Sequence, residues 1–184
     1  MKIYQYKDYD DYVKTQTKIN KSKLSRGWSY VREDTIRRIV EDHPNAQTVI
    51  CHGTRGGKEQ LFFKSFLQFG GAEVIGTEIS DTASQFPMTV QHDFTMEKSE
   101  WVGKFDIVYS NSFDHSIDPK ATLVTWKNQL SPTGKMYLEY SERDSICDPA
   151  DPLDATAAEI EGLFPAAGLK LINTITEDVR SAGV

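Results

Sequence analysis

The sequence predicts an α/β fold, doubly wound, with a mainly parallel sheet. Three observations lead to it: short apolar segments alternate with segments of helical periodicity, a glycine-rich turn follows the first apolar segment of this series, and polar residues end several of the others. Strands that alternate with helices form parallel sheets covered on both faces. The 184 residues are enough for one domain with one core.

The apolar segments are expected to be strands. The predicted strands are Thr48 to Cys51, Glu73 to Glu78, Thr89 to His92, Phe105 to Ser110, Lys135 to Tyr140 and Leu169 to Thr174. The connection between the second and third, Asp81 to Met88, is too short for a full crossover helix. One face of the sheet is therefore expected to be thinly covered at that edge.

The segments between these strands carry helix start and stop signals. Ser, Asp or Thr precedes three of them as an N-cap, and Gly or Pro follows where they end. The spacing of Thr156 and Glu159 is that of a capping box. The helices are expected over Ser29 to Asp42, Lys58 to Phe69, Asp118 to Leu130 and Thr156 to Gly168.

Residues 1–28 are polar and precede the strand–helix alternation. Tyr12, Gln16 and Ile19 have helical spacing, so we expect an N-terminal helical extension over 1–28 and the α/β domain over 29–184. Several lysines make the extension basic, which usually marks a solvated helix face. The segment as a whole is interpreted as a lid over the site described below.

Composition narrows the class of protein. The net charge of −6 disfavours non-specific binding to nucleic acid or anionic lipid. The two cysteines, Cys51 and Cys147, are far apart and form no Cys/His cluster, so neither a disulfide framework nor a metal site is predicted. Without a signal-peptide core or an apolar stretch of about 20 residues, a cytoplasmic protein with no membrane partner is expected.

The ends of the predicted strands carry the features of a nucleotide site. Gly53 permits a sharp turn out of the first strand, and Gly57 allows close approach of a ligand or helix. Glu78 ends the second strand, where a carboxylate can accept hydrogen bonds from both ribose hydroxyls. After the third strand, Asp93 is suited to an adenine amino group or to capping the next turn, and Phe94 to the ring face.

Together, these segments resemble the class I S-adenosylmethionine-dependent methyltransferases over roughly Thr48 to Thr174. Gly53 and Gly57 match the first and last glycines of the family's first motif, Glu78 its ribose acid and Asp93 its adenine-side acid. The resemblance implies S-adenosyl-L-methionine as cofactor and a small polar methyl acceptor. It implies cofactor contacts from Gly53, Thr54, Arg55, Gly57, Glu78, Ile79, Asp93, Phe94 and Asn111.

The chain departs from the family pattern at three places. Cys51 replaces the acid usual near the end of the first strand, and Arg55 replaces the middle glycine of the motif. Arg55 is equally consistent with contact to the methionine carboxylate and with exposure to solvent. After Thr174 only residues 175–184 remain, so the family's last antiparallel strand is abbreviated, missing or supplied otherwise.

Methyl transfer from a sulfonium needs alignment more than a catalytic side chain. A base is required when the acceptor must lose a proton, and four polar residues near strand ends are candidates: Asn111, His115, Glu139 and Tyr140. His115 is the catalytic residue we predict, because the ordinary imidazole pKa suits proton transfer near neutrality. A structural role for His115 is the alternative.

Two other functional classes are alternatives. A nicotinamide-dependent oxidoreductase is disfavoured because the sequence contains no Tyr-x-x-x-Lys pair and departs from Gly-x-Gly-x-x-Gly spacing. A non-catalytic, methyltransferase-like module that binds a nucleotide or a partner is the stronger alternative, given Cys51, Arg55 and the short carboxyl end. A nucleic-acid methyltransferase is not expected, because Ser110-Asn111-Ser112-Phe113 lacks the Asn/Asp-Pro-Pro-aromatic pattern.

Overall fold

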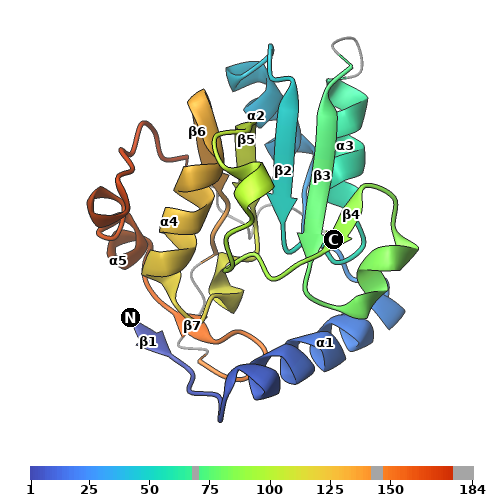
Figure 1. The fold of residues 1–184 in the computed structure, drawn as a ribbon, viewed down its shortest axis with the longest axis vertical. Coiled ribbons are helices and arrows are strands. Elements are labelled where there is room, and N and C mark those ends of the chain that lie inside the picture. The colour runs from blue at the N-terminus through green and yellow to red at the C-terminus, as the bar shows by residue number, and fades with distance from the viewer. Residues whose placement is uncertain (68–70, 142–146, 176–184) are drawn as a thin grey trace.

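The fold is an open parallel sheet with helices on both faces (Figure 1). The computed structural model describes residues 1–67, 71–141 and 147–175. The strands of the sheet are β2 (Thr48–His52), β3 (Glu73–Glu78), β4 (Thr89–Gln91), β5 (Phe105–Ser110) and β6 (Leu130–Leu138). They lie in the order β4-β3-β2-β5-β6, with every neighbouring pair parallel. The order reverses between β2 and β5, which is where ligands bind in such sheets.

The side chains of the central strands build two cores, one on each face. The described α-helices are α1 (Tyr9–Ser25), α2 (Glu33–Asp42), α3 (Lys58–Phe66), α4 (Pro119–Gln129) and α5 (Ala157–Glu161). Val49 and Cys51 of β2 pack with α2 and α3, whereas Ile50 packs with Trp126 of α4 and Ile160 of α5. Because strand side chains alternate between faces, a strand covered on both sides is apolar throughout.

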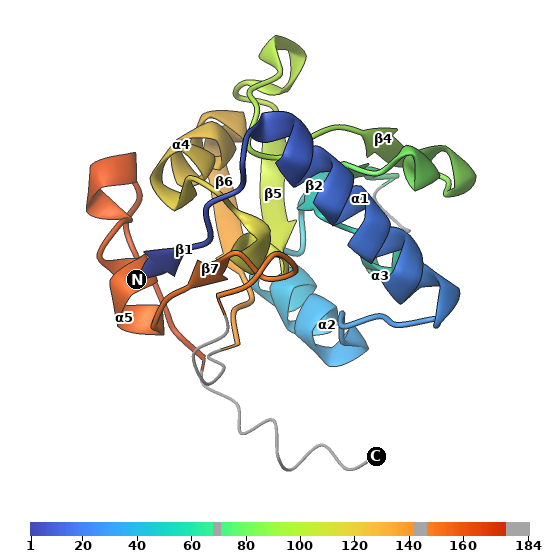
Figure 2. The same cartoon turned by 90° about the horizontal axis from the view of Figure 1, so that it is seen from below.

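The first helix lies apart from these two layers. α1 runs across the carboxyl ends of the strands, below the sheet in Figure 1 and in front of it in Figure 2. Asp8 caps it by accepting a hydrogen bond from the Asp11 backbone N–H at 2.9 Å. The chain before it is held by β1 (Lys2–Ile3), which pairs antiparallel with β7 (Leu153–Asp154). The N-terminal extension is therefore anchored to the rest of the chain through its strand.

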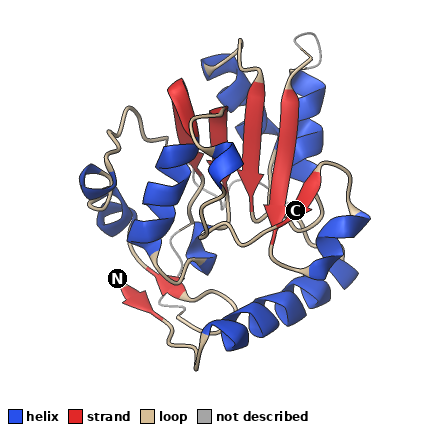
Figure 3. Cartoon of the chain, in the orientation of Figure 1, coloured by secondary structure: helices blue, strands red, loops and turns tan. Residues whose placement is uncertain are grey.

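The predicted α/β architecture is confirmed, and four of the predicted strands agree with the structure to within one residue. The fifth begins earlier than predicted, since β6 covers Leu130–Leu138 rather than Lys135–Tyr140. Between β3 and β4 the structure has only a 3₁₀ turn, Asp81–Gln85 (Figure 3). The prediction that this connection is too short for a crossover helix is thus confirmed.

Two predicted helix boundaries are wrong. Ser29 does not cap α2, which begins at Glu33 after Arg32, because the preceding segment is held towards the first-motif loop by a hydrogen bond from Arg55 Nη1 to the Trp28 carbonyl. The last helix does not extend to Gly168 but ends at Glu161, followed by the separate 3₁₀ turn Pro165–Ala167. Proline removes a backbone donor, which favours such a break. The end of the helix predicted to reach Phe69 lies partly outside the described residues.

The predicted sixth strand is also wrong. Leu169 to Thr174 has no strand or helix structure, and Leu171 and Ile172 are 45% and 76% exposed. A strand exists only where its N–H and C=O groups have a ladder partner. Within the described part of the chain this segment has none, so its apolar sequence alone does not make it a strand.

Among the described residues, no helix combines the length and the apolar character needed to cross a membrane.

Candidate functional site

The turn after β2 brings the backbone of two neighbouring strands together. Gly53 has φ +73°, and a Cβ at this position would lie 2.6 Å from Cβ of Ser112, which follows β5. Only glycine therefore fits here without displacing the second loop. The Ser112 hydroxyl donates to the Gly53 carbonyl at 3.1 Å. These contacts place the turn directly at the reversal of strand order.

Glu78 lies at the carboxyl end of β3 and is 3% exposed. Its carboxylate accepts hydrogen bonds from the backbone N–H of Ser80 at 2.9 Å and of Arg55 at 3.0 Å. Burial raises the pKa of Glu78 above its usual value, while the two backbone N–H groups and the Arg55 charge oppose the rise. The acid is thus held rigidly against the glycine-rich turn.

Asp93 and Phe94 follow β4 and face the same region. Asp93 accepts hydrogen bonds from the backbone and hydroxyl of Thr95 at 2.9 and 2.8 Å, which is the turn-capping arrangement. Its second oxygen accepts a hydrogen bond from the hydroxyl of Tyr9, on α1, at 2.8 Å. Phe94 is buried and packs edge-on against Trp126. One carboxylate oxygen of Asp93 therefore points toward the helix that covers the site.

His115 has a defined tautomer. Gln16 Nε2 lies 3.1 Å from the carbonyl oxygen of Pro149, so this atom must be the amide donor. Gln16 Oε1 is then the acceptor for His115 Nδ1 at 3.0 Å, and Nδ1 carries the proton. Burial lowers the pKa of His115, although the nearby carboxylates of Asp114 and Asp151 oppose this. The neutral ring consequently has its lone pair on Nε2.

Two carboxylates face that nitrogen. Asp114 Oδ1 and Asp151 Oδ1 lie 3.9 and 3.8 Å from His115 Nε2, and the three ligand-type atoms are within 4.8 Å of one another. Lys23 Nζ, from α1, lies 3.5 Å from Asp151 Oδ1. The ammonium group of Lys23 thus already offsets part of the negative charge in this cluster.

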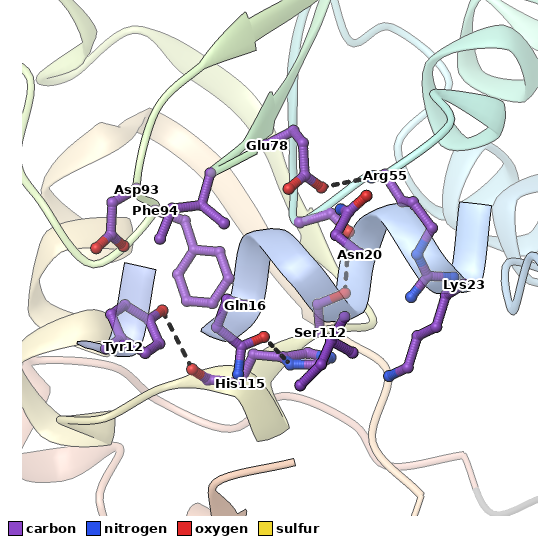
Figure 4. Close-up of a pocket in the computed structure, with 13 residues that line it drawn as sticks. Tyr12, Gln16, Asn20, Lys23, Arg55, Glu78, Asp93, Phe94, Ser112 and His115 are labelled. Carbon is purple, nitrogen blue, oxygen red and sulfur yellow. Dashed lines mark hydrogen bonds between the residues drawn. The ribbon is translucent and has the colours of Figure 1, made fainter. Parts of the chain in front are cut away.

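One pocket joins these residues (Figure 4). Its volume is only about 40 Å³, and it lies between the strand ends and α1. Seven of the residues named from the sequence line it: Gly53, Arg55, Glu78, Ile79, Asp93, Phe94 and His115. Six further residues complete the lining: Tyr12, Gln16, Ile19, Asn20, Lys23 and Ser112. Five of these six come from α1, and the helical spacing of Tyr12, Gln16 and Ile19 is the signal that could have placed them here.

Three residues named from the sequence do not line the pocket. The Thr54 hydroxyl accepts a hydrogen bond from Gln60 Nε2 at 3.1 Å, inside the protein. Gly57 has φ +71° at the start of α3 and adjoins Gln60. Asn111 is directed to Glu59, with its Nδ2 atom 3.5 Å from Glu59 Oε1. Cys51 is fully buried, and burial raises the pKa of its thiol, so this position holds no charge.

No family model and no curated protein matches this chain in sequence. Solved structures do share its fold. A SAM-dependent methyltransferase from Aquifex aeolicus superposes with a TM-score of 0.56 at 11% identity, over 78% of this chain and 92% of the other. The sugar N-methyltransferase KedS8 from Streptoalloteichus has a TM-score of 0.51 at 16% identity, over 77% of this chain and 57% of that one.

A third structure, the carbon methyltransferase CurJ, has a TM-score of 0.53 at 16% identity and matches 79% of this chain but 49% of its own. The chain thus spans most of one similar protein and about half of two others. All three are described as methyltransferases, and the last two act on different acceptor atoms, nitrogen and carbon. On this likeness and its strand order, the chain has the fold of the class I S-adenosylmethionine-dependent methyltransferases.

Proposed function

We propose that this protein is a methyltransferase that uses S-adenosyl-L-methionine to methylate a small polar acceptor. The observation that carries the proposal is Glu78, a buried carboxylate at the end of β3, held against the Gly53 turn at the reversal of strand order. An acid at this point of a doubly wound sheet is suited to both hydroxyls of a ribose. Proteins of similar structure include a sugar N-methyltransferase, a carbon methyltransferase and a mitomycin 7-O-methyltransferase.

The residues around the pocket fit the parts of this cofactor. Glu78 would bind the ribose, Asp93 the adenine amino group, and Phe94 the face of the purine ring. Ile79 would add apolar contact beside Glu78, and the turn with Gly53 would lie against the rest of the molecule. Thr54, Gly57 and Asn111 do not line the pocket. They would instead hold the conformation of the loops that follow β2 and β5.

The methyl group of the cofactor is already activated as a sulfonium, so the protein must align an acceptor with it. His115 is the proposed base, because its neutral ring has an unprotonated Nε2 and lines the pocket. It would accept the proton that an O–H or N–H acceptor loses when it is methylated. Asp114 and Asp151 would stabilise the imidazolium that forms.

Residues 1–28 would act as a lid. A cavity of about 40 Å³ is far smaller than the several hundred Å³ of ordinary ligand pockets. Side chains of α1 form one wall of the pocket and so occupy space that a bound cofactor would need (Figure 4). The cofactor would therefore enter only after α1 moves away from the strand ends.

Isothermal titration with S-adenosylhomocysteine, and with NADH as comparison, tests the proposal. We expect micromolar binding of the first and none of the second. The variant Glu78→Gln should bind S-adenosylhomocysteine at least about tenfold more weakly, since it loses hydrogen bonds to a charged acceptor. Glu41→Gln, an exposed position on α2, is the matched control. Absence of binding to wild type would overturn the proposal and favour the non-catalytic module.

A further inference from the structure

Two charged residues near the Gly53 turn have buried polar atoms without a partner. Among the described residues, Glu59 Oε2 and Arg55 Nε have no hydrogen-bond partner although both atoms are buried. Leaving such an atom unsatisfied costs about 1–3 kcal/mol, and more for a charged group. One of the two is an acceptor and the other a donor, and both belong to the segment that leads from β2 into α3. A ligand that carries both a cation and an anion would satisfy both atoms.

Glu59 lies in the first turn of α3 and is 5% exposed. Its other oxygen, Oε1, lies 3.5 Å from Asn111 Nδ2. Asn111 Oδ1 in turn lies 3.2 Å from the hydroxyl oxygen of Ser112, a residue of the pocket whose one proton is shared with the Gly53 carbonyl. The amide of Asn111 therefore lies between Glu59 and Ser112, which lines the pocket.

Burial raises the pKa of Glu59 to about 7, against the opposing effects of its own backbone N–H, of Asn111 and of the Arg55 charge. The carboxyl group therefore holds its proton to higher pH than an ordinary glutamate does. A bound cation would stabilise the ionised form and make the group release its proton. Cys51, which lies near Glu59, is neutral and offers no competing charge.

Arg55 presents its guanidinium along the pocket wall (Figure 4). Nη1 donates to the carbonyl of Trp28 at 3.1 Å, and the guanidinium carbon lies 5.5 Å from the ring centre of Tyr30. These contacts fix the direction of the side chain while Nε remains free to donate. A guanidinium pairs best with a carboxylate, through parallel N–H bonds.

We propose that Glu59 and Arg55 bind the amino-acid end of the methyl donor, Glu59 taking its α-ammonium group and Arg55 its α-carboxylate. This inference rests on the proposed function, and it assigns to Glu59 a role that the sequence motifs do not indicate. It also explains how a chain with Cys51 in place of the strand-end acid supplies a carboxylate to this part of the site. The carboxylate comes from the helix instead of the strand.

The test compares two ligands that differ only in the amino-acid end. S-adenosylhomocysteine has it, and 5′-methylthioadenosine keeps the nucleoside and sulfur without it. In titration calorimetry, Glu59→Gln and Arg55→Gln should each bind S-adenosylhomocysteine at least tenfold more weakly than wild type. Their affinity for 5′-methylthioadenosine should stay within about twofold. Glu41→Gln again serves as control.

The outcomes separate the two proposals. If wild type binds neither ligand, the proposed function fails and this inference fails with it. If wild type binds both, unchanged affinity of Glu59→Gln for S-adenosylhomocysteine overturns the inference alone. An equal loss for both ligands would also overturn it, because Glu59 would then merely support the loop.

A measurement on wild type keeps the test independent of how the variants fold. Calorimetry at pH 7 in two buffers of different ionisation enthalpy counts the protons released on binding. S-adenosylhomocysteine should release a fraction of a proton that 5′-methylthioadenosine does not release, since the ammonium group ionises Glu59. Equal proton release with the two ligands would contradict the assignment of Glu59.

Discussion

The role of His115 depends on residues that are remote in sequence. The carbonyl of Pro149 orients the Gln16 amide, and the amide then places the proton of His115 on Nδ1. Neither step follows from the sequence around His115. The free Nε2 is what makes this residue suitable as a base, and burial keeps the ring neutral by lowering its pKa.

Replacement of His115 by Asn tests this role. The Asn amide can still donate to Gln16, so we expect His115→Asn to bind S-adenosylhomocysteine like wild type. Turnover of an acceptor that loses a proton should fall by about 10² or more, the usual contribution of a general base. Steady-state kinetics check this, with His92→Asn, at an exposed hydrogen bond to Met96, as control. Wild-type turnover in His115→Asn would leave the residue a structural role.

Gly76 shows a residue-scale constraint inside the sheet. A Cβ at this position would lie 1.9 Å from Gln60 Nε2 and 2.8 Å from Thr54 Oγ1. Gln60 is fully buried and donates to Thr54 at 3.1 Å and to Thr89 at 3.0 Å, so a shift of its side chain would break these hydrogen bonds. We expect Gly76→Ala to lower the free energy of unfolding by about 1–3 kcal/mol, as overpacking does, measured by urea denaturation. Gly56→Ala, whose nearest contact would be 3.7 Å away at Leu24, should cost much less.

At the scale of elements, short helices depend on their caps. Asp118 accepts a hydrogen bond from the Ala121 backbone N–H at 2.9 Å at the start of α4, whose Leu123 and Trp126 are buried in the core. Asp118→Ala should destabilise the protein by about 1 kcal/mol, the usual cost of a lost N-cap. Thermal unfolding measures it, and Asp118→Asn, which keeps an acceptor, should remain close to wild type. A full loss in the Asn variant would contradict a capping role.

The contacts of one helix, α1, determine how the proposed lid would open. Gln16 fastens α1 to the domain through hydrogen bonds to His115 and Pro149. If α1 must open before the cofactor enters, Gln16→Ala should raise the association rate of S-adenosylhomocysteine several-fold. Stopped-flow fluorescence measures this rate, with the exposed Lys18→Ala on the same helix as control. An unchanged association rate would show that α1 does not limit entry.

At the scale of the whole molecule, buried ionisable groups link folding to pH. Burial lowers the pKa of His52 to about 3, between Thr77 and Gln129 and stacked on Trp126. The unfolded chain binds a proton at His52 near pH 6.5, whereas the folded protein binds it only near pH 3. Stability from this group is therefore present above pH 6.5 and lost as the pH falls toward 3.

Glu59 and Glu78 oppose this trend, because their raised pKa values make the folded protein bind protons at higher pH than the unfolded chain does. The effect of His52 is therefore isolated by a variant. Relative to His52→Gln, wild type should lose about 2.5 kcal/mol of unfolding free energy between pH 7 and 4.5. Urea denaturation across this range measures the difference. A difference independent of pH would show that His52 becomes protonated in the folded protein.

Local sequence signals are sufficient to predict several elements of this fold. Apolar runs predicted β2, β3, β4 and β5, Gly53 predicted the sharp turn, and Glu78 was named as a site residue from its place at a strand end. Such signals depend on residue type and spacing within a few positions, and both can be read directly from the sequence. The segment Leu169 to Thr174 shows the limit, because its composition is that of a strand but a strand also needs a partner.

The contacts between side chains of different elements are a property of the tertiary structure. It brought α1 over the strand ends, joined Gln16 to His115, and left Glu59 and Arg55 with buried atoms that have no partner among the described residues. These features depend on contacts between residues far apart in the chain, and on the desolvation that packing imposes. Burial changes the pKa values and hydrogen-bond partners of side chains only once the fold has formed. No local sequence pattern therefore reveals these contacts.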